Sequence, residues 1–150
     1  MFDVQTLQPG ALDMAEMIAR ANWPGDKSVA ANIHAELHDP SINYCVALAR
    51  GRVVGFAGWR KSGIDYHVAE LTWCNVLKEF RGRGIGRLLT DFRIADIRAA
   101  GLTTVLCGTT SPNIYRSYGF KSLGKFELAH GHTDLMILLL DPVMPNITNR

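Results

Sequence analysis

The sequence has few of the features that mark membrane, exported or disulfide-bonded proteins. Its longest uninterrupted apolar run, residues 135–140, is far too short to cross a bilayer. The chain also opens without the basic segment and apolar core of an export signal. Its cysteines are odd in number and lie in apolar strand-like contexts, which indicates reduced core thiols, at Cys45, Cys74 and Cys107. We therefore expect a cytoplasmic protein without a membrane partner.

The sequence also has little excess of one charge over the other. Sixteen Lys and Arg residues against 14 Asp and Glu residues leave a formal net charge of only +2. A nucleic-acid-binding protein usually carries a broad basic face. Here the one basic cluster consists of Arg81, Arg83, Arg87, Arg93 and Arg98. We expect this cluster to serve a local anion, with no nucleic-acid partner.

The composition is that of an average globular protein, 47% hydrophobic and 20% charged. A chain of 150 residues has the length of one ordinary domain, so residues 1–150 are expected to form a single domain. Apolar periodicity predicts helices at residues 12–19, 29–37, 85–99 and 113–118. Strand patterns occur at residues 2–7, 44–49, 53–59, 66–77, 103–107, 120–128 and 133–140. This order predicts a mixed α/β fold in which the strand at 103–107 follows a parallel crossover.

A glycine-rich loop separates the strand at 66–77 from the helix at 85–99. The loop comprises Arg81, Gly82, Arg83, Gly84, Ile85, Gly86 and Arg87. Glycines let a ligand approach the backbone closely, and a helix N-terminus presents unpaired N–H groups with partial positive charge. The pattern therefore predicts a phosphate site, with a glycine turn that binds no ligand as the alternative.

Two familiar phosphate loops do not fit this segment. A dinucleotide fingerprint requires its third glycine one residue later than Gly86. The phosphate loop of nucleotide hydrolases requires a Lys-Ser or Lys-Thr pair after the last glycine, and none follows here.

Three segments together resemble the GNAT superfamily of N-acetyltransferases. The pattern Arg81-x-x-Gly84-x-Gly86 is similar to the acyl-coenzyme A loop of that family. Residues 69–76 resemble its central strand, and residues 115–120 resemble its Tyr-x-x-x-Gly-Phe segment. The resemblance implies a mixed, mostly antiparallel sheet of six to seven strands, flanked by about four helices and splayed at the central strand.

The resemblance also implies acetyl-coenzyme A as the co-substrate. Backbone groups of Cys74, Asn75 and Val76 are expected to pair with the pantetheine arm, and residues 81–87 to hold the pyrophosphate. The N–H near Val76 is expected to polarise the thioester carbonyl. One departure is Gly108, which stands where many family members have an asparagine that contacts the cofactor.

Glu70 and Tyr115 are the candidate catalytic residues. Glu70 lies six residues before Val76 on the same strand, where a carboxylate suggests either a substrate cleft or an ion pair. As a general base it would accept the proton of the amine. The resemblance places Tyr115 near the thioester sulfur, and a phenol with a pKa of about 10 suits proton donation to the thiolate. Packing is the structural alternative for Tyr115.

The expected acceptor is the primary amine of a small molecule. The resemblance places it between residues 22–26 and the turn at residues 130–132, with Tyr66 and Trp73 nearby. A protein or peptide acceptor, or a non-catalytic acyl-coenzyme A-binding module, is the alternative. His34 and His38 have metal-ligand spacing but no third ligand, so no metal is expected. The expected assembly is a homodimer that pairs through an exposed final strand.

Overall fold

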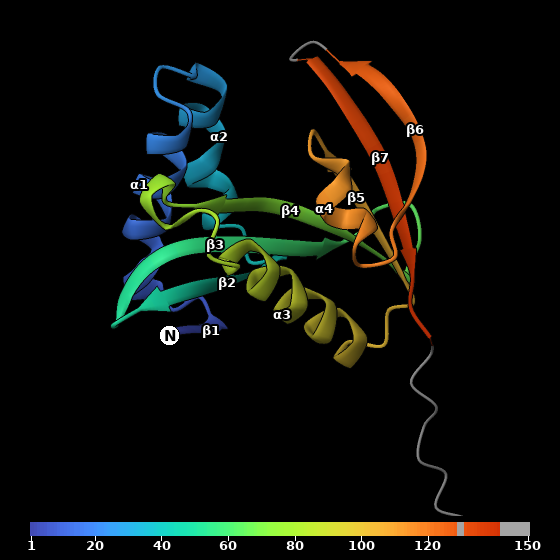
Figure 1. Cartoon of the computed structure of the whole chain (residues 1–150), viewed down its shortest axis with the longest axis horizontal. Helices are drawn as coiled ribbons and strands as arrows, with labels where there is room; N and C mark the ends of the chain where they lie inside the picture. Colours follow the sequence, from blue (N-terminus) through green and yellow to red (C-terminus); the bar gives the residue numbers. More distant parts are fainter. Residues whose placement is uncertain (129–130, 142–150) are drawn as a thin grey trace, which may run out of the picture. The chain divides into compact units, whose positions relative to one another are not determined.

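The computed structural model describes residues 1–128 and 131–141. The elements, in chain order, are β1 (Phe2–Thr6), η1 (Pro9–Ala11), α1 (Leu12–Asn22), α2 (Lys27–Leu37), β2 (Ile42–Ala49), β3 (Arg52–Lys61), β4 (Val68–Val76), η2 (Lys78–Phe80), α3 (Ile85–Ala99), β5 (Thr104–Thr109), α4 (Pro112–Arg116), β6 (Lys121–Leu128) and β7 (Gly131–Leu139) (Figure 1). None of the helices in this described part is long and apolar enough to span a bilayer.

Hydrogen bonding arranges the described strands in the order β1-β2-β3-β4-β5-β7-β6. β4 and β5 pair in parallel, whereas β1–β2, β2–β3, β5–β7 and β6–β7 pair antiparallel. The expected mixed, mostly antiparallel sheet with about four helices is confirmed, and so is the parallel crossover that precedes β5.

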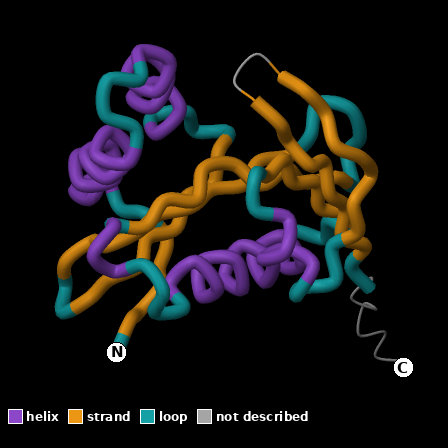
Figure 2. The backbone as a smooth tube through the Cα atoms, turned by 45° about the horizontal axis from the view of Figure 1, so that its top comes forward, coloured by secondary structure: helices purple, strands orange, loops and turns teal. Residues whose placement is uncertain are grey.

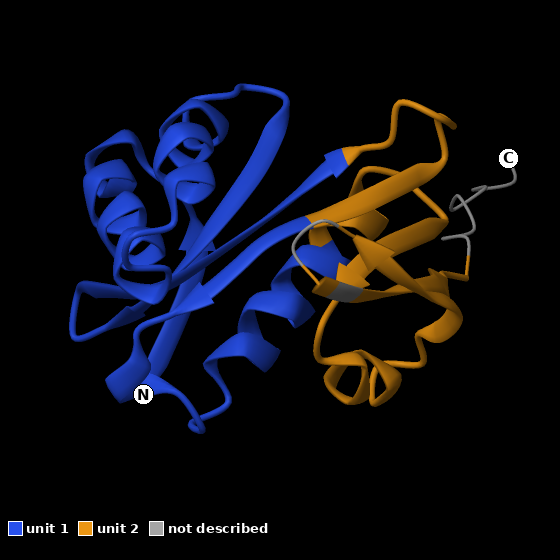
Figure 3. Cartoon of the chain, turned by 90° about the horizontal axis from the view of Figure 1, so that it is seen from above, with its two compact units in different colours: residues 1–60, 72–95 blue, residues 61–71, 96–150 orange. Residues whose placement is uncertain are grey.

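The chain divides into two compact units (Figure 3). The first unit contains residues 1–60 and 72–95, and the second contains residues 61–71 and 96–150. Both β4 and α3 begin in one unit and end in the other.

The first unit is a sheet of β1, β2, β3 and the end of β4 that is covered on both faces. Helices α1 and α2 lie on one face and the beginning of α3 on the other (Figure 2). Because both faces are covered, β3 is an almost continuous buried run rather than an alternating one. The core centres on Ile18 and Ile33 from the helices, Phe56 from β3 and Leu89 from α3, all fully buried.

Two connections in the first unit follow simple local rules. The Asp26 carboxylate caps α2, accepting hydrogen bonds from the backbone N–H groups of Ser28 at 2.8 Å and Val29 at 3.2 Å. The turn between β2 and β3 places Arg50 and Gly51 at positive φ, 49° and 77°. That conformation matches the twist of hairpin strands and favours glycine or asparagine.

The second unit is built around β5, β7 and β6, with the beginning of β4. Val105 on β5, Met136 on β7 and Phe120 before β6 are buried. The prediction of an exposed final strand is wrong, because β7 pairs with β5 on one side and with β6 on the other. The hairpin folds so that β6 takes the outer position, which leaves β6 at the edge of the sheet.

Two smaller expectations also differ from the structure. The strand predicted to begin at Tyr66 begins at Val68, because Asp65 forms a turn whose carboxylate accepts a hydrogen bond from the His67 N–H at 2.8 Å. Tyr66 is therefore outside the strand and 89% exposed. Cys45 and Cys107 are buried as expected, but Cys74 is exposed and is not a core thiol.

Candidate functional site

The end of β4 presents one backbone edge away from its neighbour β3. The Leu77 N–H donates to the Val54 carbonyl of β3 at 2.9 Å, so strand alternation directs the backbone groups of Val76 to the opposite edge. In the described part of the chain, the β4–β5 ladder extends only from Val68 to Glu70. Residues 72–76 of β4 therefore have no strand paired along that second edge within the described residues.

The carbonyl at this edge is held by side chains. The Asn22 Nδ2 donates to the Val76 carbonyl at 3.3 Å and to the Asn75 Oδ1 at 3.1 Å. The Arg81 Nε donates to the same Val76 carbonyl at 3.2 Å. Both lone pairs of this carbonyl are thereby used, so the group that Val76 can offer to a ligand is its N–H. The contacts join α1, β4 and the glycine loop at one point.

Asn75 is the buried member of this group. Its side chain is 1% exposed, and its Nδ2 has no hydrogen-bond partner among the described residues. Strand alternation directs its backbone groups toward β3, as it does for Leu77. Asn75 therefore acts within the protein, by holding Asn22 against Val76.

The glycine loop leads directly into α3, a helix of 15 residues. Gly82 and Gly84 have φ angles of 75° and 82°, which L-residues with a side chain rarely adopt. A Cβ at Gly82, Gly84 or Gly86 would meet no atom within 4 Å, so the loop is open at all three positions. The first turn of α3 contains no acidic residue, and the exposed Arg81, Arg83 and Arg87 surround it.

These features make the loop suitable for an anion. The first N–H groups of a helix have no partner within the helix, and its dipole adds a partial positive charge of about half a unit. Glycine at 82 and 84 keeps side chains out of the way. A phosphate fits this chemistry better than a neutral ligand does.

A carboxylate that the sequence analysis missed lies close to the β4 edge. The Trp73 Nε1 on β4 donates to the Glu36 Oε2 on α2. Burial raises the pKa of Glu36, with a smaller opposing effect from Arg60. The ring of Trp73 also meets that of Trp23 edge to face, with centroids 5.6 Å apart. No sequence signal identifies Glu36, because its partner is 37 residues away.

Trp23, which contacts Trp73, comes from the helix loop at residues 22–26 that was expected to face the acceptor. Trp23 and Trp73 are brought together as that expectation requires. Asn22 instead contacts β4, and Asp26 caps α2. Tyr66 lies in the second unit. Of the residues expected on the opposite side, His130 and the side chain of His132 lie outside the described residues.

The two predicted catalytic residues belong to the second unit. Glu70 is half-buried on β4 and is in register with Leu106 of β5. Tyr115 is half-buried on α4, where its ring meets Phe120 edge to face with centroids 5.5 Å apart. The Tyr115 carbonyl accepts hydrogen bonds from the N–H groups of Tyr118 at 3.0 Å and Phe120 at 3.3 Å, which fix the end of the short helix.

His34 and His38 have ordinary contacts. His34 Nδ1 lies 3.0 Å from the Glu16 Oε2, and His38 Nδ1 lies 2.8 Å from the His34 carbonyl oxygen. Among the residues that the structure describes, no group of three or more His, Cys, Asp or Glu side chains is arranged to hold a metal ion.

Comparison with known families identifies the fold. The model of the acetyltransferase (GNAT) domain matches residues 40–122, more than half of the chain. The chain belongs to the GNAT family. It is therefore an N-acetyltransferase, and the match includes the end of β4, the glycine loop, α3 and α4. No curated protein sequence matches the chain.

Solved structures share the GNAT fold at low sequence identity. A GNAT-family protein from Desulfovibrio desulfuricans has a TM-score of 0.83 and 13% identity, with 94% of this chain and 100% of that chain covered. An aminoglycoside 6′-N-acetyltransferase complexed with coenzyme A has a TM-score of 0.79 and 20% identity, with 93% and 98% covered.

A third relative acts on a protein rather than on a small molecule. The ribosomal-protein-S18-alanine N-acetyltransferase from Escherichia coli has a TM-score of 0.70 and 20% identity, with 100% of this chain and 99% of that chain covered. GNAT proteins of this fold therefore include small-molecule and protein acetyltransferases, and at least one of these structures binds coenzyme A.

Proposed function

We propose that this GNAT protein transfers the acetyl group of acetyl-coenzyme A directly to the primary amine of a small molecule. The observation that carries the donor assignment is the glycine loop, in which two left-handed glycines, Gly82 and Gly84, precede a 15-residue helix. Residues 81–87 hold the pyrophosphate, and the open edge of β4 at Cys74 and Val76 receives the pantetheine arm. The coenzyme A complex of a structural relative supports this reading.

The residues present fit this donor. The loop has no side chain at its three glycines, and the backbone N–H of Val76 points toward the free edge of β4, where a thioester carbonyl can be polarised. Arg81 has a second role beyond its charge, because its Nε holds the Val76 carbonyl in place. Acetyl-coenzyme A supplies the activated acetyl group, and the protein aligns and polarises it.

The chemistry requires three proton transfers. Glu70 accepts a proton from the ammonium form of the acceptor, so that the neutral nitrogen can attack the thioester carbonyl carbon. A nitrogen–carbon bond forms and the carbon–sulfur bond breaks. Tyr115 donates its phenolic proton to the departing thiolate, which leaves as the free thiol, and the second proton of the attacking nitrogen restores the Tyr115 phenol, so that a neutral amide is released.

The acceptor assignment rests on the contacts of Trp23, Trp73 and Glu36. Two indole rings that meet edge to face, with a carboxylate bonded to one of them, provide cation–π attraction and a counter-charge for an ammonium group. Because burial raises the pKa of Glu36, acceptor binding is expected to weaken below neutral pH sooner than it would with an ordinary glutamate. An aminoglycoside acetyltransferase among the structural relatives supports a small polyamine as the class to test first.

The test is a panel of amines, polyamines, aminoglycosides and peptides with acetyl-coenzyme A, followed by thiol release. We expect small amines to be acetylated, and Glu70→Gln and Tyr115→Phe each to lower kcat by about 10²–10⁴-fold. Tyr115→Phe should lose the basic limb of the pH–rate profile, and Glu70→Gln should lose the acidic limb. A residue that only packs would leave both limbs in place. Acetylation of peptides alone would reject the small-molecule acceptor.

We also propose that residues 1–150 work as one N-acetyltransferase domain in the cytoplasm. Two elements, β4 and α3, run through both compact units, which supports a single folding unit. Reduced thiols at Cys45, Cys74 and Cys107 support the compartment. A single unfolding transition, followed by both tryptophan fluorescence and far-UV circular dichroism, is the expected result.

A further inference from the structure

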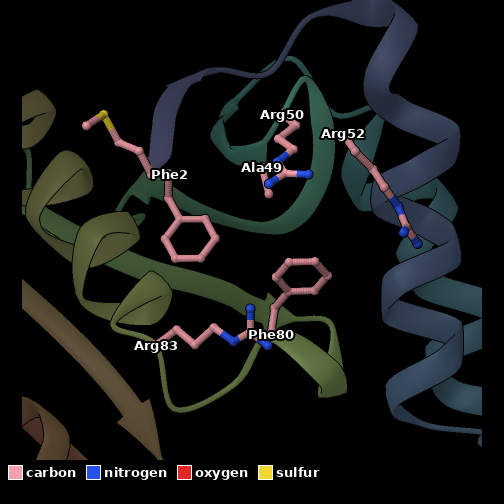
Figure 4. A pocket seen from close by; sticks show the side chains of 7 residues that line it. Phe2, Ala49, Arg50, Arg52, Phe80 and Arg83 are labelled. Atoms are coloured by element: carbon pink, nitrogen blue, oxygen red, sulfur yellow. The ribbon is translucent and has the colours of Figure 1, made fainter.

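The donor loop at residues 81–87 packs at the protein surface through its exposed Arg83. The guanidinium carbon of Arg83 lies 5.2 Å from the centroid of the Phe80 ring, and Phe80 meets Phe2 edge to face, with centroids 6.4 Å apart. Figure 4 shows these three side chains around a hollow of about 540 Å³. A cation–π contact at an exposed site contributes little. Stronger contacts that fix α3 relative to β4 have to come from the helix itself.

Arg93 on α3 supplies such contacts from inside the first unit. It belongs to the basic cluster that was expected to serve an anion, yet it is only 1% exposed. Its Nη1 donates to the Gly58 carbonyl of β3 and to the Thr72 carbonyl of β4, each at 3.1 Å, and its Nη2 donates to the Thr90 Oγ1 at 3.0 Å. A buried guanidinium is costly, and an apolar side chain would fill this helix face without that cost. Packing alone therefore does not explain an arginine at this position.

The two carbonyls that Arg93 binds lie where β4 has one residue more than β3. The Leu77 N–H donates to the Val54 carbonyl, which places these two residues opposite each other. A Cβ at Gly58 would overlap the Thr72 Oγ1, so Gly58 lies against Thr72. Thr72 to Leu77 is five steps along the chain, whereas Val54 to Gly58 is four, and such a mismatch indicates a β-bulge. Arg93 therefore supplies a donor to both strands where their ladder is interrupted.

The same arginine connects to the start of α3 through Thr90. Thr90 is 2% exposed, and its Oγ1 donates to the Gly86 carbonyl at 2.9 Å. Gly86 is the third glycine of the donor loop, and Thr72 lies two residues before Cys74 on β4. Hydrogen bonds therefore run without a break from Gly86 through Thr90 and Arg93 to Thr72. Those that Arg93 donates are charge-assisted and buried, which makes them stronger than hydrogen bonds between neutral groups.

We infer that Arg93, supported by Thr90, is a positioning residue that fixes the donor loop relative to the open edge of β4. The inference rests on the proposed function, in which the loop holds the pyrophosphate and Val76 polarises the thioester of one and the same donor. A ligand that is bound at two places gains affinity from its linkage only when those places are held at a matching separation. Loss of the Arg93 contacts should therefore weaken binding of the complete donor and spare a fragment that reaches only the loop.

The test compares two probes on the full chain by isothermal titration, directly or by competition. Coenzyme A is long enough to span the loop and β4, whereas adenosine 3′,5′-bisphosphate is its phosphate-bearing half and lacks the pantetheine arm. In Arg93→Lys, an ammonium group cannot reproduce the fork of a guanidinium. Thr90→Val removes the hydroxyl at nearly the same size. The matched controls are Thr90→Ser, which keeps the hydroxyl, and Arg20→Lys, which makes the same exchange as Arg93→Lys at an exposed position of α1.

We expect Arg93→Lys and Thr90→Val to bind coenzyme A about fivefold to twentyfold more weakly than wild type, and the bisphosphate within about twofold of wild type. The KM for acetyl-coenzyme A should rise in the same proportion, while the KM for the amine stays near its wild-type value. Both controls should bind both probes as wild type does. Urea unfolding shows whether each variant is folded, and Thr90→Val decides the outcome if Arg93→Lys does not fold.

The inference is overturned if a folded variant keeps the wild-type ratio of the two affinities. That ratio is also kept when both affinities fall together, which is the result of a merely structural role. A chain that transfers acetyl groups with the same KM in wild type and in both variants refutes the inference alone. A chain whose coenzyme A binding depends on Arg93 and Thr90, yet transfers no acetyl group, refutes the proposed acetyl transfer alone. A wild-type chain that binds neither probe refutes the donor assignment and the inference together.

Discussion

Replacement of Asn22 by alanine removes a side chain that hydrogen-bonds α1 to the end of β4 at the proposed donor site. The Asn22 Nδ2 donates to the Asn75 Oδ1 at 3.1 Å and to the Val76 carbonyl at 3.3 Å, across 53 and 54 positions of sequence. Asn75 is 1% exposed and its Nδ2 has no partner among the described residues. The Asn22→Ala change therefore leaves the entire Asn75 amide buried without a hydrogen bond.

The expected cost follows from these contacts. A buried polar group left without a partner costs about 1–3 kcal/mol. The Val76 carbonyl keeps the Arg81 Nε at 3.2 Å, so its loss adds only a few tenths of a kcal/mol. We expect Asn22→Ala to lower the free energy of unfolding by about 2 kcal/mol, which corresponds to a fall in Tm of roughly 4–8 °C for a chain of this size.

Urea unfolding of a double-mutant cycle measures this coupling. Once Asn75→Ala has removed the buried amide, adding Asn22→Ala should cost less than about 1 kcal/mol, so the two changes should couple by about 1–2 kcal/mol. The KM for acetyl-coenzyme A should rise more than the KM for the amine, because the Val76 carbonyl, which also accepts from Arg81, loses its hydrogen bond from Asn22. Additive effects, or an Asn22→Ala protein as stable as wild type, would refute the reasoning.

Four further predictions concern stability. Burial raises the pKa of Glu36, so protonated Glu36 stabilises the folded chain below the ordinary pKa of 4.5, and this stabilisation is lost as pH rises through the raised folded pKa. Urea unfolding should therefore show that wild type loses stability relative to Glu36→Gln from about pH 4 to pH 7. Hydrogen bonds from Arg20 and then His34 lower the pKa of Glu16, so its stabilisation is present above the ordinary value of 4.5 and is lost as pH falls through the lowered folded pKa. Glu16→Gln should therefore lose stability relative to wild type as pH rises toward 4.5 from below, and the same slope in both proteins there would contradict the assignment. Gly58→Ala would place a Cβ in contact with Thr72 and 2.7 Å from the Tyr44 ring, and should lower the free energy of unfolding by about 1–3 kcal/mol. Gly63→Ala is the matched control, because a Cβ there would meet no atom within 4 Å. Arg50→Gly removes the strain of a left-handed backbone at a residue with a side chain and should raise Tm slightly. A lower Tm would show that the Arg50 side chain stabilises the turn.

Features that depend on neighbouring residues could be predicted from the sequence. The apolar stripe of α3, the buried run of β3 and the glycines before α3 all follow local periodicity or backbone preference. The loop at residues 81–87 could be predicted from its alternating glycines and arginines before a helix pattern, and the structure adds that Gly82 and Gly84 have positive φ. These local signals predict a mixed α/β fold and a phosphate site, whereas the mostly antiparallel sheet and the acyl-coenzyme A loop were expected from the family resemblance.

Features that depend on distant contacts could not be predicted. Glu36 resembles any polar residue of α2 until Trp73, 37 residues away, is placed beside it. Asn22 was assigned to the acceptor loop, and only the fold shows that it holds Val76. Cys74 has an apolar neighbourhood in sequence, yet the free edge of β4 leaves it exposed. The position of β7 inside the sheet depends on the order of the strands, and the alternation of apolar and polar residues along a strand does not determine that order.

The most direct test of acetyl transfer follows labelled acetyl groups from acetyl-coenzyme A into a panel of small amines by mass spectrometry, with thiol release recorded in the same reaction. Direct acetyl transfer should give one acetylated amine for each thiol released, and a large loss of both signals in Tyr115→Phe. Tight binding of acetyl-coenzyme A without transfer to any amine or peptide would contradict it, and would make the chain an acyl-coenzyme A-binding module instead.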